Sequence, residues 1–249
     1  MTALRVAVAG RSDVGRLRDG NEDAWFIGRR VMVVADGLGG HAAGEVASRL
    51  AVEQLAALDE RADASWADDV DSARAALREA IEAANRTVRQ AAAADLARAG
   101  MGTTVTAAVV VGDRLCLGHV GDSRAYLLRD GALRQLTEDH SHVAELVRAG
   151  QITPAEARVH PHRAVITRAL GLEDTVEVDT PEPEPLAPGD VVLLCSDGLT
   201  EPLTDEAIAQ LIAGVDDPDR ACAVLVDAAN AAGGPDNITV VVAVVDGPA

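Results

Sequence analysis

Residues 103–136 read TTVTAAVVVGDRLCLGHVGDSRAYLLRDGALRQL, and this stretch decides the fold class. Its four apolar runs are separated by turns at Gly112-Asp113, Gly121-Asp122-Ser123 and Asp130-Gly131. Turns of two or three residues join antiparallel neighbours, because a parallel connection needs about a dozen residues or more. We therefore predict an antiparallel meander with strands over 103–111, 115–120, 125–128 and 133–136.

Helical and strand patterns surround this meander. Apolar residues recur at helical spacing over 44–59 and 69–99, and 204–212 and 218–232 also predict helices. The proline-containing segment 177–188 predicts an edge strand or an extended connector. Strands predicted over 31–35 and 191–195 are apolar on both faces, and 238–245 predicts a closing strand. Such strands need cover on both sides, so we predict two stacked sheets with helices outside.

Composition excludes several classes of function. The 249 residues are 48% hydrophobic and 25% charged, which is enough for a sizeable core. A net charge of −18 argues against nucleic acid as a general partner, because phosphate backbones are bound by clustered Lys and Arg. No apolar stretch approaches a membrane span, and the first ten residues lack a signal-peptide pattern. Three cysteines without CxxC spacing predict a reducing compartment, so we expect a cytoplasmic protein without a membrane partner.

Three acidic dipeptides stand at the ends of apolar strands. Asp36-Gly37 follows the strand at 31–35, Asp197-Gly198 follows the strand at 191–195, and Asp236-Asn237 precedes the strand at 238–245. A carboxylate at the end of a buried strand is costly unless a positive charge meets it. The chain contains no lysine and little arginine near these acids. A bound metal ion is the simplest compensation.

Further oxygen ligands and a phosphate-binding group lie near these dipeptides. Glu22, Asp23 and Asp122 add carboxylates, and Gly37 allows close approach of a backbone carbonyl. Ligand sets made only of oxygen select Mg²⁺ or Mn²⁺ over zinc or copper. Arg18 is a candidate phosphate ligand, because a guanidinium grips phosphate oxygens in pairs. Two ions and an arginine would make a centre for phosphoryl hydrolysis.

Other interpretations of the same residues remain open. A single Asp-Gly dipeptide is more typical of a turn than of a metal ligand. His140-Ser-His142 and His160-Pro-His162 are compatible with zinc, although such pairs are more often surface or hydrogen-bonded histidines. Cys195 is better interpreted as a small core residue than as a reactive thiol.

Six motifs in order give the chain a family resemblance. The motifs are Arg18-Asp-Gly-Asn-Glu-Asp23, Val34-Ala-Asp-Gly-Leu-Gly-Gly-His41, Met101-Gly-Thr-Thr104, Val120-Gly-Asp-Ser-Arg-Ala-Tyr126, Leu194-Cys-Ser-Asp-Gly-Leu199 and Gly234-Pro-Asp-Asn-Ile-Thr-Val240. With these motifs the chain resembles the PP2C family of metal-dependent serine/threonine phosphatases, bacterial branch, over about 4–245.

The resemblance implies an α+β fold and a ligand set. The fold is a four-layer α-β-β-α sandwich, with two mostly antiparallel sheets packed face to face and flanked by helices. It forms one domain over 1–249, with a flap at about 140–169. The implied ligands of two Mn²⁺ or Mg²⁺ ions are Asp36, shared by both, with Glu22 and the Gly37 carbonyl on one and Asp197 and Asp236 on the other. Asp23 would orient a water molecule, Asp122 would help to hold a third, weaker ion, and Arg18 would bind phosphate.

The resemblance also implies an activity. We expect direct hydrolysis of phosphoserine and phosphothreonine in proteins by a metal-activated water, opposing Ser/Thr kinases, in a monomer. One departure concerns the leaving group: eukaryotic relatives place a proposed general acid, His, directly after Asp-Gly, whereas Leu38 stands here and His41 comes three positions later. Two alternatives stay open, a non-catalytic phosphoprotein-binding regulator of the same fold and a phosphatase of small phosphomonoesters.

Overall fold

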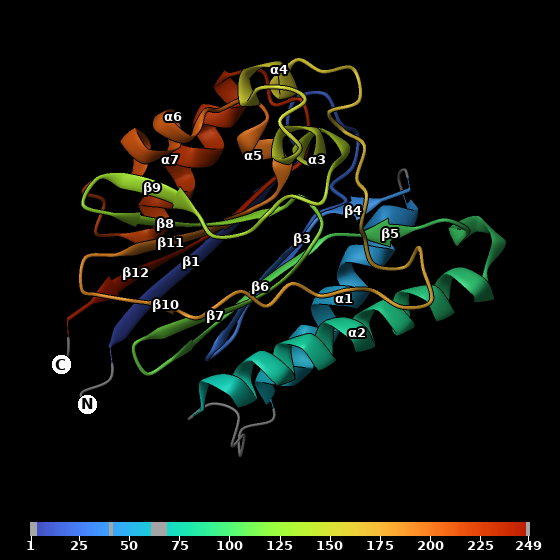
Figure 1. Cartoon of the computed structure of the whole chain (residues 1–249), viewed down its shortest axis with the longest axis horizontal. Coiled ribbons are helices and arrows are strands. Elements are labelled where there is room, and N and C mark those ends of the chain that lie inside the picture. Colours follow the sequence, from blue (N-terminus) through green and yellow to red (C-terminus); the bar gives the residue numbers. More distant parts are fainter. Residues whose placement is uncertain (1–3, 40–41, 61–68, 248–249) are drawn as a thin grey trace.

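Two five-stranded sheets pack face to face in the computed structural model, which describes residues 4–39, 42–60 and 69–247 (Figure 1). Every strand pairing is antiparallel. One sheet has the order β1 (Arg5–Asp13), β12 (Ile238–Asp246), β11 (Val191–Cys195), β8 (Arg124–Arg129) and β9 (Ala132–Gln135). The other has the order β10 (Glu184–Pro185), β7 (Arg114–Val120), β6 (Val105–Val111), β3 (Val31–Ala35) and β2 (Ala24–Ile27).

Helices cover the outer face of each sheet, as Figure 1 shows. The sheet of β3 and β6 is covered by α1 (Ala42–Glu60) and α2 (Val70–Ala94), the latter followed by the short helix η2 (Leu96–Arg98). The sheet of β11 and β12 is covered by α6 (Asp205–Ile212) and α7 (Pro218–Ala231). The predicted four-layer sandwich is confirmed. None of the described helices is both long enough and apolar enough to cross a membrane.

Apolar residues on both faces of the central strands fill three successive core layers. Val33 packs under α1 and α2, whereas its neighbour Val34 points into the layer between the two sheets. Leu193 packs under α6 and α7, and Leu194 points between the sheets. Each such buried side chain contributes about 1.5–3 kcal/mol to stability relative to an exposed one. These strands are therefore apolar on both faces because each lies between the core under the helices and the core between the two sheets.

The predicted meander is wrong at one turn. Strands β6 and β7 pair in one sheet and β8 and β9 pair in the other, so the chain crosses between the sheets at Gly121-Asp122-Ser123. Gly121 has a φ of +113°, and a Cβ there would collide with the side chain of Thr104. Glycine adopts this left-handed conformation without strain, and beyond it β8 pairs with β11 of the other sheet. The crossing places Asp122 at the seam between the two sheets.

Three features of the elements were not predicted. Strand β1 extends to Asp13, because residues 11–13 pair with 238–240 of β12. The helix predicted over 69–99 ends at Ala94, with Asp95 as cap. A short helix, α5 (Asp197–Thr200), starts directly after β11. It turns the chain at the end of the strand and was not predicted.

The segment after β9 forms a separate lobe above the end of the sheets (Figure 1). It contains α3 (His142–Arg148) and α4 (Pro154–Arg158), and Thr153 caps α4 through a capping box, as the Thr-Pro start predicted. The two ends of the lobe meet: the Thr167 N–H donates to the His140 carbonyl at 2.8 Å, and Ser141 bridges to Ile166. We call residues 142–165 the flap.

Candidate metal and phosphate site

The predicted acids lie where strands from both sheets end. Asp36 follows β3, Asp197 opens α5 after β11, and Asp236 lies just before β12. A cleft of about 700 Å³ is lined by Asp122, Asp197 and Asp236, by flap residues such as Val147, and by the start of α6. Segments far apart in the sequence therefore meet at one end of the sandwich, below the flap.

Two threonines hold the backbone of Asp36. Its N–H donates to Thr104 Oγ1 at 2.9 Å, and its carbonyl accepts from the Thr104 N–H at 2.9 Å and from Thr103 Oγ1 at 2.8 Å. These contacts accompany the small two-stranded pairing of β4 (Gly37–Leu38) with β5 (Gly102–Thr103). These hydrogen bonds fix the backbone of Asp36, which restricts where its side chain can lie.

Glu22 lies against the start of α1. Its N–H donates to Asn237 Oδ1 at 2.8 Å, and its carbonyl accepts from Ser48 Oγ at 2.5 Å. Any Cβ at Gly44 would collide with Glu22 Oε2, and one at Gly37 would collide with the Gly44 backbone. The two glycines thus leave the space in which the Glu22 carboxylate sits beside Gly37.

Asp23 and Asp197 approach each other through the end of β11. Ser196 Oγ donates to Asp23 Oδ2 at 2.7 Å. Three buried carboxylate oxygens, Asp23 Oδ1, Asp122 Oδ1 and Asp197 Oδ1, have no hydrogen-bond partner among the described residues. A buried polar atom without a partner costs about 1–3 kcal/mol. Something outside the protein is needed to satisfy these oxygens.

Burial and mutual repulsion raise the pKa of the clustered acids. Burial and then the nearby carboxylates raise the pKa of Asp23 to about 7, and burial together with Asp236 raises that of Asp197 to about 6. The pKa values of Asp36 and Asp122 are shifted upward, again mainly by burial. A cation bound beside these acids would lower their pKa values again and stabilise the ionised carboxylates.

Arg18 and Asp236 already interact. Arg18 Nη2 donates to Asp236 Oδ2 at 2.6 Å, and this hydrogen bond raises the pKa of the guanidinium. The Arg18 side chain is 51% exposed, so it reaches the cleft from its solvent side. Within the described ranges, no group of three or more His, Cys, Asp or Glu side chains is arranged as a metal-binding cluster. A metal-binding role for Asp236 would require this carboxylate to give up its arginine partner.

The residues present fit hard divalent cations. The donors are carboxylates and backbone carbonyls, which suit Mg²⁺ and Mn²⁺. The buried oxygens of Asp23, Asp122 and Asp197 that lack a hydrogen-bond partner are able to accept a cation. Asp122, Asp197 and Asp236 line one cleft, and Asp23 and Asp36 lie close enough to these acids for the carboxylates to raise one another's pKa.

Four supporting residues were not predicted as part of the site. Ser196, Thr103, Thr104 and Asn237 make the hydrogen bonds that hold Asp23, Asp36 and Glu22. Thr103 and Thr104 belong to one of the six motifs and begin the strand predicted over 103–111. Two features of the sequence could have identified these residues. Ser196 directly precedes the predicted ligand Asp197, and Asn237 directly follows Asp236. In addition, polar side chains inside otherwise apolar strands need a hydrogen-bond partner.

The histidines of the zinc alternative form no metal-binding group among the described residues. His140 is buried and bonded to Gly121 and Asp179, whereas the rings of His142, His160 and His162 lie near one another, with centres 5.6–6.2 Å apart. Cys195 is fully buried, which agrees with a core role. His41 lies outside the described residues.

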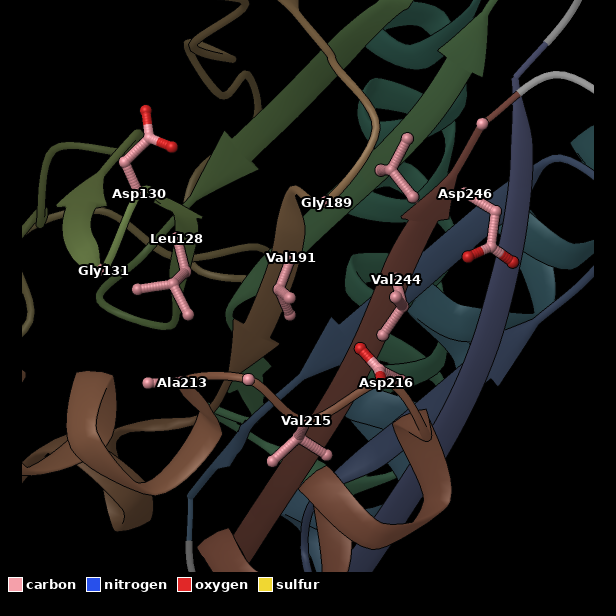
Figure 2. Close-up of a pocket in the computed structure, with 13 residues that line it drawn as sticks. Leu128, Asp130, Gly131, Gly189, Val191, Ala213, Val215, Asp216, Val244 and Asp246 are labelled. Carbon is pink, nitrogen blue, oxygen red and sulfur yellow. The ribbon is translucent and has the colours of Figure 1, made fainter.

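A second cavity, of about 360 Å³, lies at the opposite end of the sandwich (Figure 2). Val191 at the start of β11 and Val244 near the end of β12 form part of its lining, and Asp130, Asp216 and Asp246 stand around it. It contains none of the predicted site residues. We therefore place the chemistry in the cleft below the flap.

Comparisons with known proteins show the family to which the chain is similar. A family model described as protein phosphatase 2C matches residues 18–217. The serine/threonine protein phosphatase PstP of Mycobacterium tuberculosis is 46% identical over 240 residues, which are 96% of this chain and 45% of PstP. The serine/threonine phosphatase stp of Listeria monocytogenes is 40% identical over 236 residues, 92% of each chain.

A solved structure is similar as well. The catalytic domain of PstP in complex with two manganese ions matches with a TM-score of 0.86 and 42% identity, covering 98% of this chain and all of that domain. The present chain thus spans less than half the length of PstP but all of its crystallised catalytic domain.

Proposed function

Because the chain belongs to the protein phosphatase 2C family, we propose that it hydrolyses phosphoserine and phosphothreonine in proteins with the help of two Mn²⁺ or Mg²⁺ ions. The observation that carries this proposal is the set of buried, unpartnered oxygens of Asp23, Asp122 and Asp197 in one cleft. The two manganese ions in the similar PstP domain support the choice of metal.

The proposed ligands are those that the family resemblance implies. Asp36 would serve both ions, Glu22 and the Gly37 carbonyl would serve one, and Asp197 and Asp236 would serve the other. Asp122 would help to hold a third, weaker ion. When bound, the ions supply a polarised water nucleophile and offset the charge of the phosphoryl group. The rigid attachment of Asp36 to Thr103 and Thr104 supports its central place.

The protein's own groups position the reactants. Asp23 Oδ2 is held by Ser196, which leaves Oδ1 to accept a hydrogen bond from the attacking water and to orient it. Arg18 binds two phosphate oxygens after it separates from Asp236. Leu38 offers no proton to the leaving alkoxide, so the proton would come from water, either metal-bound or from solvent. The reaction proceeds in one step without a phosphoenzyme.

The setting of the activity is also part of the proposal. We expect a monomeric cytoplasmic enzyme that opposes Ser/Thr kinases, and the three free, buried cysteines are compatible with a reducing compartment. Residues 1–249 form one phosphatase domain, with the flap subdomain at about 140–169. The meeting of the flap ends at His140 and Thr167 supports that boundary.

The deciding experiment is phosphate release from a phosphothreonine peptide, measured with Mn²⁺ and with an excess of chelator. The proposal requires turnover with manganese and its loss with chelator. A faster rate on a sugar phosphate than on the peptide would favour the small-phosphoester alternative. Manganese binding and phosphopeptide binding without turnover would favour the non-catalytic regulator.

A further inference from the structure

The imidazole of His140 joins three parts of the molecule at the root of the flap. The residue is 4% exposed, and it lies directly before the flap. The Gly121 N–H donates to His140 Nδ1 at 3.0 Å, and the His140 N–H donates to the Gly121 carbonyl at 2.8 Å. His140 is therefore attached twice to the turn that crosses between the sheets and carries Asp122.

The other ring nitrogen faces a carboxylate. Because Nδ1 accepts a hydrogen bond, the proton of the neutral ring is on Nε2, which lies 3.1 Å from Asp179 Oδ2. Asp179 Oδ1 accepts from Arg168 Nη1 at 2.6 Å. This Nη1 also lies 2.9 Å from His140 Nε2, and because both nitrogens carry hydrogen, both donate to the Asp179 carboxylate and not to each other. Arg168 follows the flap, so both ends of the flap converge on Asp179.

Asp179 is itself anchored to a strand. Its backbone exchanges two hydrogen bonds with His119 of β7, at 2.9 and 3.0 Å. The His119 ring lies 4.9 Å from the His140 ring, centre to centre. The clamp, by which we mean His140, Arg168 and Asp179, thus ties the flap root to the same strand that ends at the Asp122 turn.

From these contacts we propose that His140 is a positioning residue that fixes the Asp122 turn through Nδ1 and the flap root through Nε2. This inference rests on the proposed function, in which Asp122 helps to hold an ion and the flap covers the cleft. Asp122 is 8% exposed, and its Oδ1 has no protein partner among the described residues, so its direction depends on the turn. Only a side chain that accepts on one side and donates on the other serves both contacts.

Two substitutions separate the two contacts. His140→Asn places an amide oxygen near the position of Nδ1, keeps the acceptor for Gly121 and loses Asp179. His140→Gln places an amide near the position of Nε2, keeps the donor for Asp179 and loses Gly121. The matched control is His162→Asn, an exposed flap histidine outside the clamp.

The two variants should fail differently. Removal of a group that orients a metal ligand typically costs about 10-fold or more in metal affinity, so His140→Gln should weaken Mn²⁺ binding in calorimetry by about 10-fold. His140→Asn should keep wild-type manganese affinity. It should instead speed tryptic cleavage in the flap at Arg148, Arg158 or Arg163 and raise KM for a phosphothreonine peptide, with kcat on p-nitrophenyl phosphate unchanged.

The outcomes are distinct from those of the proposed function. If the wild-type chain shows no manganese-dependent turnover, the phosphatase proposal fails. If the wild type turns over but both His140 variants match the control in calorimetry and proteolysis, or both lose the same properties, the positioning role is wrong. Should neither variant fold, Asp179→Asn decides: it must loosen the flap in proteolysis while manganese affinity stays at the wild-type value.

Discussion

Arg18 and Asp236 are 218 positions apart, yet Arg18 Nη2 lies 2.6 Å from Asp236 Oδ2 at the mouth of the cleft. Arg18, the proposed phosphate-binding residue, and Asp236, a proposed metal ligand, are therefore hydrogen-bonded to each other in the structure. Both side chains remain partly exposed, so the pair is screened by solvent and contributes little to stability. The pair matters for the proposed function, because Asp236 would have to leave Arg18 to bind a metal ion and Arg18 would have to leave Asp236 to bind phosphate.

Replacement of Arg18 by Lys should lower kcat/KM on a phosphothreonine peptide by about 10-fold, because lysine cannot make the paired contact to phosphate. Manganese affinity should not fall, since Asp236 is released from its tightest protein partner. Steady-state kinetics and calorimetry measure the two effects. Arg16→Lys, at an exposed neighbouring arginine, is the control. Equal kinetics for both variants would contradict a phosphate role for Arg18.

Replacement of Asp36 by Asn should remove activity and stabilise the metal-free protein. The raised pKa of Asp36 comes mainly from burial and from Asp23 and Asp197, so an uncharged amide relieves repulsion at neutral pH. Hydrolysis of p-nitrophenyl phosphate should fall by about 100-fold or more. Thermal unfolding in chelator should show a higher Tm than that of the wild type. A lower Tm, or retained turnover, would contradict the electrostatic account.

Manganese should stabilise the protein more at pH 7.5 than at pH 5.5. Binding requires ionised carboxylates, and the pKa values of about 7 for Asp23 and about 6 for Asp197 leave these groups protonated at the lower pH. The measurement is the shift in Tm between saturating Mn²⁺ and chelator at each pH. A shift that does not change with pH would mean that manganese binds elsewhere.

Gly44→Ala should weaken manganese binding although it removes no carboxylate. A Cβ at Gly44 would occupy the place of Glu22 Oε2 and push this side chain away from Gly37. Calorimetry should detect the loss. Gly20→Ala, where a Cβ meets nothing within 4 Å, is the matched control. Unchanged affinity in Gly44→Ala would argue that Glu22 is not a ligand.

Stability should fall in acid partly because of His119. Burial lowers the pKa of this histidine from 6.5 to about 4, so the folded state disfavours its charged form. Its contribution is complete above the unfolded pKa of 6.5 and is lost as pH falls from 6.5 towards 4, by up to about 3 kcal/mol. His119→Gln should flatten the urea-unfolding free energy over this range, and His162→Gln should not.

The family, the layers and the acid positions were predictable because they depend on local patterns. Strands at 31–35 and 191–195 are apolar on both faces, and this alone implies cover from two sides. The crossing at Gly121 was not predictable from turn length, since a short turn can also pass between sheets. Likewise, α5 and the extension of β1 to Asp13 depend on partners supplied by distant strands.

The sequence by itself indicated which side chains are candidates for the chemistry, because acids at the ends of apolar strands are costly unless a cation meets them. The tertiary structure decided which of them face one another. Arg18 with Asp236, Asp23 with Ser196 and His140 with Gly121 are pairs that no local pattern specifies. Their distances follow from how two sheets stack and where the chain crosses between them, and that depends on packing of the whole core.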